Sequence, residues 1–126
     1  MDHNALREVS NIAQSDKHLS KRWFSSQAAD LFIWHDGERF SRFEFCYDKH
    51  RNEYSLRWKL GSGFSHARVD DGEGVATGKS SPILVACEKA DSDYIFTAFK
   101  NLSDKVEMPV RFFIMRKLLG FIHNER

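Results

Sequence analysis

The chain has 126 residues, and its 19 Lys and Arg against 18 Asp and Glu give a formal net charge of +1 with neutral histidines. This length predicts one domain, residues 1–126, that buries a core of its own and needs neither a metal ion nor disulfides to fold. The near-zero charge disfavours a general nucleic-acid binder, because neutralising phosphates takes a clear basic excess. We therefore expect a small globular protein without strong electrostatic steering.

The polar first residues, the short apolar runs and the isolated cysteines together predict a cytoplasmic protein with no membrane partner. The first residues are polar and lack the basic segment and apolar run of a secretory signal. The longest apolar runs, 83–87 and 112–115, are far shorter than a membrane span. Cys46 and Cys87 lie singly within apolar runs, which is typical of buried free thiols rather than of a redox or zinc motif.

We expect a short N-terminal helix over residues 4–13, within a peripheral segment, residues 1–20, that can fray. Its apolar residues recur at near-helical spacing, at positions Leu6, Val9, Ile12 and Ala13. Residues 15–22 are polar and locally basic, which predicts a solvated connection.

Three segments, 30–35, 39–47 and 53–60, predict an antiparallel β meander with one apolar face. The first is a continuous aromatic and aliphatic run, and the dipeptide Asp36-Gly37 after it favours a tight hairpin turn. In the other two segments, large apolar side chains alternate with polar ones, as in strands. The apolar positions are Phe43, Phe45, Tyr47, Tyr54, Leu56, Trp58 and Leu60.

Residues 61–81 hold five of the seven glycines and show no periodicity, so we expect a long loop there. Residues 82–87 predict a fourth strand, with Pro82 at its first position, where a missing N–H costs least. A helix should follow, because Asp91, Ser92 or Asp93 can cap it. Its apolar positions keep helical spacing at Ile95, Ala98, Phe99 and Leu102.

Pro109 is placed to open a second C-terminal helix that runs to about residue 122. Its apolar residues form two stripes, more than one buried face needs, so we expect the helix to be either deeply buried or packed against a partner. The candidate interface residues are Phe112, Met115 and Leu119. The predicted fold is α+β, with an antiparallel meander of about four strands, two C-terminal helices packed on one face and a short N-terminal helix.

Two glycine-containing segments imitate cofactor motifs without fulfilling them. Gly78-Lys79-Ser80 lacks the glycine five positions earlier that a phosphate-binding loop needs, and a strand follows it instead of a helix. Gly61-Ser62-Gly63 lacks the third glycine of a dinucleotide fingerprint. The sequence therefore predicts no cofactor.

One constellation of chemically active residues remains in the predicted 61–81 loop. A histidine near carboxylates can be a base oriented by an acid, or part of a metal site. The other interpretation is an acidic surface turn held by side-chain-to-backbone hydrogen bonds. The candidate catalytic residues are His66, Asp70, Asp71 and Glu73, close to Arg68.

The polar face of the meander is a second candidate site. The residues expected there are Arg42, Glu44, Arg57 and Lys59, beside Phe32 and Trp34. Aromatic rings with arginines on an open sheet can stack single-stranded bases. The other interpretation is a sheet face with cross-strand ion pairs. The candidate ligand-binding residues are Arg42, Glu44, Arg57 and Arg68.

The pattern of the segments 22–24, 29–34, 43–48, 64–66, 69–73 and 81–84 resembles a group of small bacterial proteins of unknown function. The resemblance covers residues 20–88 and implies a bacterial, cytosolic protein. It brings no catalytic residue, ligand or partner with it.

The preferred interpretation is a non-enzymatic protein-interaction or ligand-binding module that self-associates or binds another protein through the helix over 109–122. The alternative is a small metal-binding or hydrolase-like enzyme that uses the 61–81 loop. Single-stranded RNA binding on the sheet face ranks third. Basic residues concentrate at 17–22 and 111–117 and acidic ones in the loop, so the small net charge hides local patches of both signs.

Overall fold

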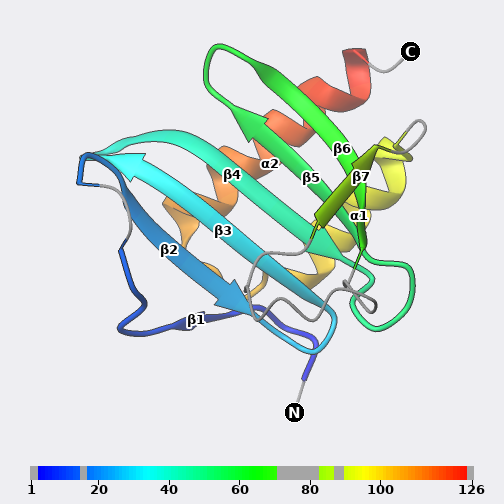
Figure 1. The fold of residues 1–126 in the computed structure, drawn as a ribbon, viewed down its shortest axis with the longest axis horizontal. Coiled ribbons are helices and arrows are strands. Elements are labelled where there is room, and N and C mark those ends of the chain that lie inside the picture. The colour runs from blue at the N-terminus through cyan, green and yellow to red at the C-terminus, as the bar shows by residue number, and fades with distance from the viewer. Residues whose placement is uncertain (1–2, 15–16, 71–82, 87–89, 125–126) are drawn as a thin grey trace.

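The computed structural model describes residues 3–14, 17–70, 83–86 and 90–124. Within these ranges, seven strands form one antiparallel sheet in which each strand pairs with the next along the chain (Figure 1). Two helices follow and lie side by side across one face of this sheet, which confirms the α+β class. The elements are β1 (Arg7–Val9), β2 (Ser20–Ser25), β3 (Ala29–Asp36), β4 (Arg39–Tyr47), β5 (Tyr54–Lys59), β6 (Gly63–Asp70), β7 (Ile83–Ala86), α1 (Ser92–Leu102) and α2 (Met108–Asn124).

The core lies between the sheet and the two helices, on what we call the covered face. Alternate residues of β3, β4 and β5 point to this side, and the predicted apolar set of the meander is buried there, apart from the exposed Leu60 and the half-buried Tyr54. Rings link the two layers: Phe45 meets Phe99 of α1 edge-on, with centroids 5.3 Å apart. The fully buried side chains include Phe24, Leu31, Ile33, Phe43, Phe45, Leu56, Ile95, Phe99, Val110, Ile114 and Leu118.

Both helices begin where the sequence predicts. The Asp91 side chain accepts a hydrogen bond from the Tyr94 backbone N–H at 3.1 Å, so Asp91 is the N-cap of α1. Pro109 lies in the first turn of α2, where its missing N–H has no intrahelical partner to lose. The turn at Asp36-Gly37 also forms as predicted, with Gly37 at φ +62°.

The predicted N-terminal helix is wrong, and the short strand β1 stands in its place. Leu6 is fully buried, and its backbone N–H donates to the Leu102 carbonyl at 2.8 Å, which ties this segment to the end of α1. Arg7–Val9 then pair with β2. A strand of three residues is too short to show a period of two, so the spacing of Leu6 and Val9 imitated a helix.

The predicted connection over 15–22 is also wrong, because β2 begins at Ser20. Its Lys21 and Trp23 point to one side of the sheet, while Arg22 and Phe24 point to the other. Adjacent basic residues on both sides hide the apolar alternation that identifies a strand.

The predicted loop over 61–81 contains the strand β6, so the sheet has more strands than the four expected. Gly61 and Gly63 have φ of +86° and +84° and shape the turn from β5 to β6. Along β6, His66 and Arg68 occupy the side that elsewhere carries apolar residues. The difference in polarity between the two sides of this segment is therefore too small to predict a strand. The predicted fourth strand matches β7.

Candidate ligand-binding groove

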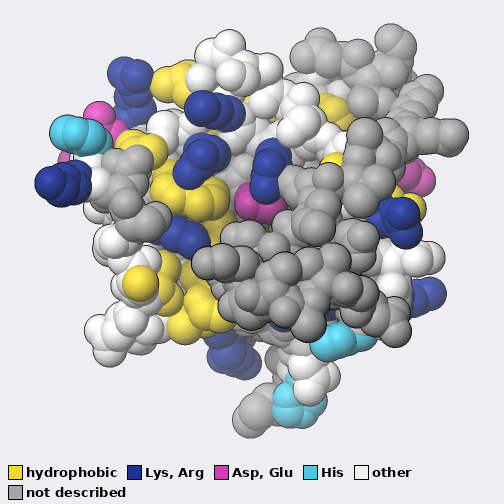
Figure 2. All heavy atoms as spheres, viewed as in Figure 1, with side chains coloured by type: hydrophobic (Ala, Val, Ile, Leu, Met, Phe, Trp, Pro, Cys, Tyr) yellow, Lys and Arg dark blue, Asp and Glu magenta, His cyan; other side chains and the backbone are white. Residues whose placement is uncertain are grey.

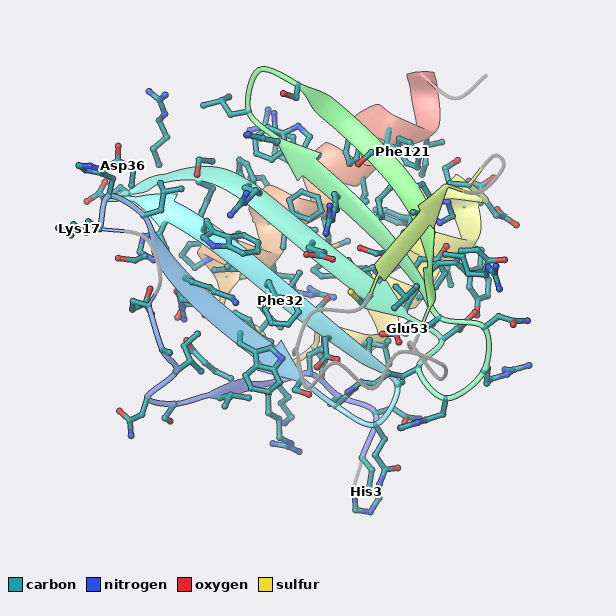
Figure 3. All side chains as sticks on the ribbon, in the orientation of Figure 1. His3, Lys17, Phe32, Asp36, Glu53 and Phe121 are labelled. Atoms are coloured by element: carbon teal, nitrogen blue, oxygen red, sulfur yellow. The ribbon has the colours of Figure 1, made fainter. Side chains whose placement is uncertain are left out.

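Three aromatic side chains form a row on the face of the sheet away from the helices, which we call the open face. Trp23 on β2 stacks on Phe32 of β3, with ring centroids 5.8 Å apart and an interplanar angle of 15°. Phe32 is followed by Trp34, with centroids 6.3 Å apart. All three side chains are only partly buried, and Phe32 lies near the middle of the face (Figure 3). We call these residues the aromatic row.

A groove of about 780 Å³ runs over the aromatic row. Residues 9–13 form one of its walls, and side chains of β3, β4 and β5 form its floor. Figure 2 shows this face, where hydrophobic side chains lie among lysines and arginines. The volume is within the range of sites for small molecules.

The wall of the groove is held by a charge network behind it. Arg22 of β2 binds both carboxylate oxygens of Glu8 on β1 at 2.8 Å, and it also reaches Glu107, at 2.9 and 3.2 Å, just before α2. This hydrogen bond to Arg22 lowers the pKa of Glu107. One guanidinium thereby joins β1, β2 and the start of α2, which fixes the segment that carries the wall.

Carboxylates gather at one end of the groove. Asp30 accepts hydrogen bonds from Trp23 Nε1 at 3.0 Å and Ser25 Oγ at 2.6 Å, and its other oxygen lies 3.1 Å from Lys49 Nζ. These partners neutralise the carboxylate and hold the Trp23 indole in one orientation. Burial, together with the charge of Asp30, raises the pKa of Glu53, which lines the same end.

Glu44 lies on the floor of the groove and is also neutralised. Its Oε2 accepts a hydrogen bond from Ser55 Oγ at 2.8 Å and lies 3.4 Å from Arg57 Nε. The Cys46 thiol is 3.7 Å from the same oxygen, and burial, with the nearby Glu44 charge, raises the pKa of this thiol. The thiol therefore stays protonated near neutral pH, which disfavours a nucleophilic role for it.

Cations lie over the other end of the aromatic row. Lys21 Nζ is 4.9 Å from the Phe32 ring centroid and 5.5 Å from that of Trp34. The Arg42 guanidinium carbon lies 4.1 Å from the Trp34 centroid. Such contacts place positive charge against the negative faces of the rings. The groove thus has the paired carboxylate of Asp30 at one end and, among the described residues, cations without a carboxylate partner at the other.

The structure brings three of the four predicted ligand-binding residues together on the open face. Arg42, Glu44 and Arg57 occupy neighbouring positions of β4 and β5, with Glu44 directly opposite Arg57. Arg68 does not join them. It pairs with Tyr54, so it points to the covered side of the sheet, where it lies exposed at the rim.

The predicted catalytic constellation is only partly within the described residues. His66 lies on β6, where its Nε2 is 2.7 Å from the Tyr47 hydroxyl and its ring stacks on Tyr54 at 5.2 Å. Its neighbours there are aromatic side chains on the covered side. Asp70 ends β6, and Asp71 and Glu73 lie outside the described residues. Within the described ranges, no three of the His, Cys, Asp and Glu side chains gather to hold a metal ion.

The predicted interface residues lie along α2. Phe112 and Leu119 are exposed, at 57% and 45%, and Met108 joins them at 61%. Met115 lies between them in sequence and is half-buried against the core. Spacings of three and four residues place these side chains in one apolar stripe on the outer side of the helix. We call them the α2 stripe.

Comparisons with models of protein families, with curated proteins and with solved structures find no match. Among the helices in the described part of the chain, none is long and apolar enough to cross a membrane.

Sequence reasoning missed Lys21 and Trp23 as groove residues because it missed β2. The segment gave no local signal for a strand, because Lys21 and Trp23 on one side and Arg22 and Phe24 on the other each combine a basic residue with an aromatic one.

Proposed function

We propose that this protein binds a small, planar aromatic molecule in the groove on the open face. The observation that carries the proposal is the aromatic row. Trp23, Phe32 and Trp34 place three rings side by side on a sheet face that the helices do not cover. A row of accessible rings lining a concave surface suits a flat apolar ligand, because stacking buries both partners at once.

The polar groups around the row support a small ligand of defined orientation. The carboxylates of Asp30 and Glu44 already have partners, so they give shape and fixed dipoles without demanding a cation. The hydrogen bond from Trp23 Nε1 to Asp30 fixes the Trp23 ring, and the Arg42 guanidinium packs on the Trp34 ring. Two of the three rings are therefore held in place before a ligand binds. A site ordered in advance loses less conformational entropy on binding.

The same features favour a small molecule over an RNA strand. A strand needs a continuous basic track for its phosphates. Here Asp30, Glu44 and Glu53 line the groove, so it offers a phosphate backbone no continuous basic track. The wall formed by residues 9–13 also gives the groove the shape of a compartment on one side.

The test uses the neutral probe 2-naphthamide and titration calorimetry. We expect binding, with NMR amide shifts confined to β2, β3, β4 and residues 9–13. Trp23→Ala and Phe32→Ala should each weaken binding by about tenfold, because each removes one stacking surface worth roughly 1–3 kcal/mol. Phe112→Ala is the matched control, since this ring is exposed on α2 instead.

Three results would overturn the proposal. The first is no binding of the probe. The second is binding that Trp23→Ala and Phe32→Ala leave unchanged. The third is tighter binding of a short oligouridylate than of the probe, with an affinity that falls steeply with salt, since this would assign the face to RNA.

Self-association through the α2 stripe is a second candidate function. The outward side of α2 carries Met108, Phe112 and Leu119, where a solvated helix would carry polar residues. A second copy of this chain is the occupant that we propose. Antiparallel packing would place the Met108 end of one stripe against the Leu119 end of the other, so the same surface serves both copies.

Light scattering after size exclusion, over a range of protein concentrations, tests this second function. We expect the mass to rise toward that of a dimer, and Phe112→Ser combined with Leu119→Ser should keep the chain monomeric. Lys105→Ser, an exposed change between the helices, is the control. A monomer at every concentration would show that the stripe does not bind a second copy.

A further inference from the structure

Two cations face each other on the open face beside the aromatic row. Arg42 of β4 and Lys59 of β5 are direct cross-strand partners. Like charges at directly opposite positions of an antiparallel pair destabilise the sheet. In the described ranges, no carboxylate lies within ion-pair distance of either side chain. Glu44, on the same face, pairs with Arg57 instead. The sheet therefore carries an uncompensated pair of positive charges at this point.

The Arg42 guanidinium is held in a setting that limits its hydration. Its carbon lies 4.1 Å from the centroid of the Trp34 ring, and its Nε is buried with no hydrogen-bond partner. A buried donor without an acceptor costs free energy, and more so when it is charged. The side chain as a whole is only partly buried, so the guanidinium charge can still be reached from one side.

That side opens into a hollow of about 420 Å³ next to the groove. Arg42, Lys59 and Trp34 line it, together with Ser62 and Ser65 near the turn between β5 and β6. Glu44 also lines the hollow, but its carboxylate is paired with Arg57, which lines it as well. The hydroxyl groups of the two serines are further hydrogen-bond donors for a ligand, beside the two cations. Trp34 lines both the groove and the hollow, so the two spaces meet at its ring.

We propose that the hollow binds an acidic group, a carboxylate or a phosphate, and that the ligand of this protein is an aromatic acid. The ring would lie on the aromatic row, and the acid would accept hydrogen bonds from Arg42 and Lys59. This assignment rests on the proposed function, because it names the chemical class of the ligand of the same groove. An anion there offsets the repulsion between the two cations and neutralises the guanidinium.

The test compares two probes of the same shape, 2-naphthoate and the neutral 2-naphthamide, by calorimetry at low salt. We expect the carboxylate to bind about tenfold more tightly, because it gains charge-assisted hydrogen bonds that the amide lacks. Arg42→Gln combined with Lys59→Gln should abolish the preference for naphthoate, so that the two probes bind the variant equally, even where loss of the Arg42 contact with Trp34 weakens both. Lys105→Gln, which removes a distant exposed charge, is the control.

Each outcome separates this assignment from the proposed function. Equal affinity of the two probes for the unaltered protein would overturn the acid site and leave the aromatic groove standing. A preference for naphthoate that survives the double substitution would do the same, because it would place the anion elsewhere. Failure of both probes to bind would overturn the groove and, with it, the acid site. Repeating the comparison with 2-naphthyl phosphate shows whether the hollow prefers a phosphate to a carboxylate.

Discussion

On the covered face of the sheet, Phe43 and Phe45 are fully enclosed by the helices, whereas on the open face Phe32 and Trp34 keep part of their rings accessible. Both pairs come from the same two-residue alternation on adjacent strands. They differ in their neighbours. The rings of the covered face meet other apolar groups, and those of the open face lie under Lys21 and Arg42. Partial exposure and attached charge, more than aromatic content, separate the proposed binding surface from the core.

The largest expected effect comes from removing a ring from the covered face. Phe45→Ala should lower the free energy of unfolding by roughly 3–5 kcal/mol, because Phe45 is fully buried and its loss leaves a cavity against Phe99. Denaturant unfolding followed by circular dichroism measures this change. If the free energy of unfolding falls by less than about 1 kcal/mol, the covered face tolerates the removal of a ring as well as the open face does.

The next effect tests the polar support of the open face. Asp30→Asn should cost about 2 kcal/mol, because it removes the charge that pairs with Lys49 while both side chains are largely buried. The Trp23 indole should keep its orientation, since the amide oxygen of asparagine can still accept the N–H that Asp30 Oδ1 accepts. Denaturant unfolding reports the loss of stability, and tryptophan fluorescence anisotropy reports the unchanged orientation of the indole. Asp36→Asn, at an exposed turn, is the control, and equal effects of both substitutions would contradict this role for Asp30.

A ring of the open face should matter much less for stability than its counterpart. Phe32 is only partly buried, so Phe32→Ala should cost about 1 kcal/mol or less, in proportion to the apolar area it covers. Binding of 2-naphthamide should weaken in the same protein, which separates function from folding. If unfolding instead shows a loss comparable to that of Phe45→Ala, the aromatic row is part of a core.

The sequence predicted the parts of this contrast that depend on local pattern. The strands β4 and β5 were predictable because apolar and polar residues alternate clearly around Phe43, Phe45 and Leu56, and β3 was predictable as a continuous aromatic and aliphatic run. The helix α1 was predictable from its cap at Asp91 and its apolar spacing. The same alternation placed Arg42 with Glu44 on the polar side of the meander.

The missed parts depend on long-range packing. In β2, Arg22 points to the covered side, where Glu8 and Glu107 pair with its charge. Glu107 is 85 residues away in the sequence. In β6, His66 occupies a similar position because Tyr47 and Tyr54 enclose its ring. Neither arrangement is visible in a local window of sequence. The pairing of Arg42 with Lys59 required the strand register as well.

The smallest effect concerns the rim where the two faces meet. Glu107→Gln breaks the ion pair between Arg22 and the start of α2, and an exposed pair of this kind contributes at most about 1 kcal/mol. The hydrogen bond from Arg22 lowers the pKa of Glu107 in the folded protein, so the folded state binds this proton less readily than the unfolded state. The contribution is therefore complete above the ordinary glutamate pKa of about 4.3 and is lost as the pH falls through the lower folded value.

Denaturant unfolding of the unaltered protein and of Glu107→Gln, at several pH values, measures this contribution. The difference between the two proteins should be largest near neutral pH, shrink below about pH 4 and also shrink in about 1 M salt, which screens exposed charges. Glu38→Gln, an exposed change at the turn between β3 and β4, is the matched control. A difference that persists at low pH would show that Glu107 acts through packing, and the wall of the groove would then not depend on charge.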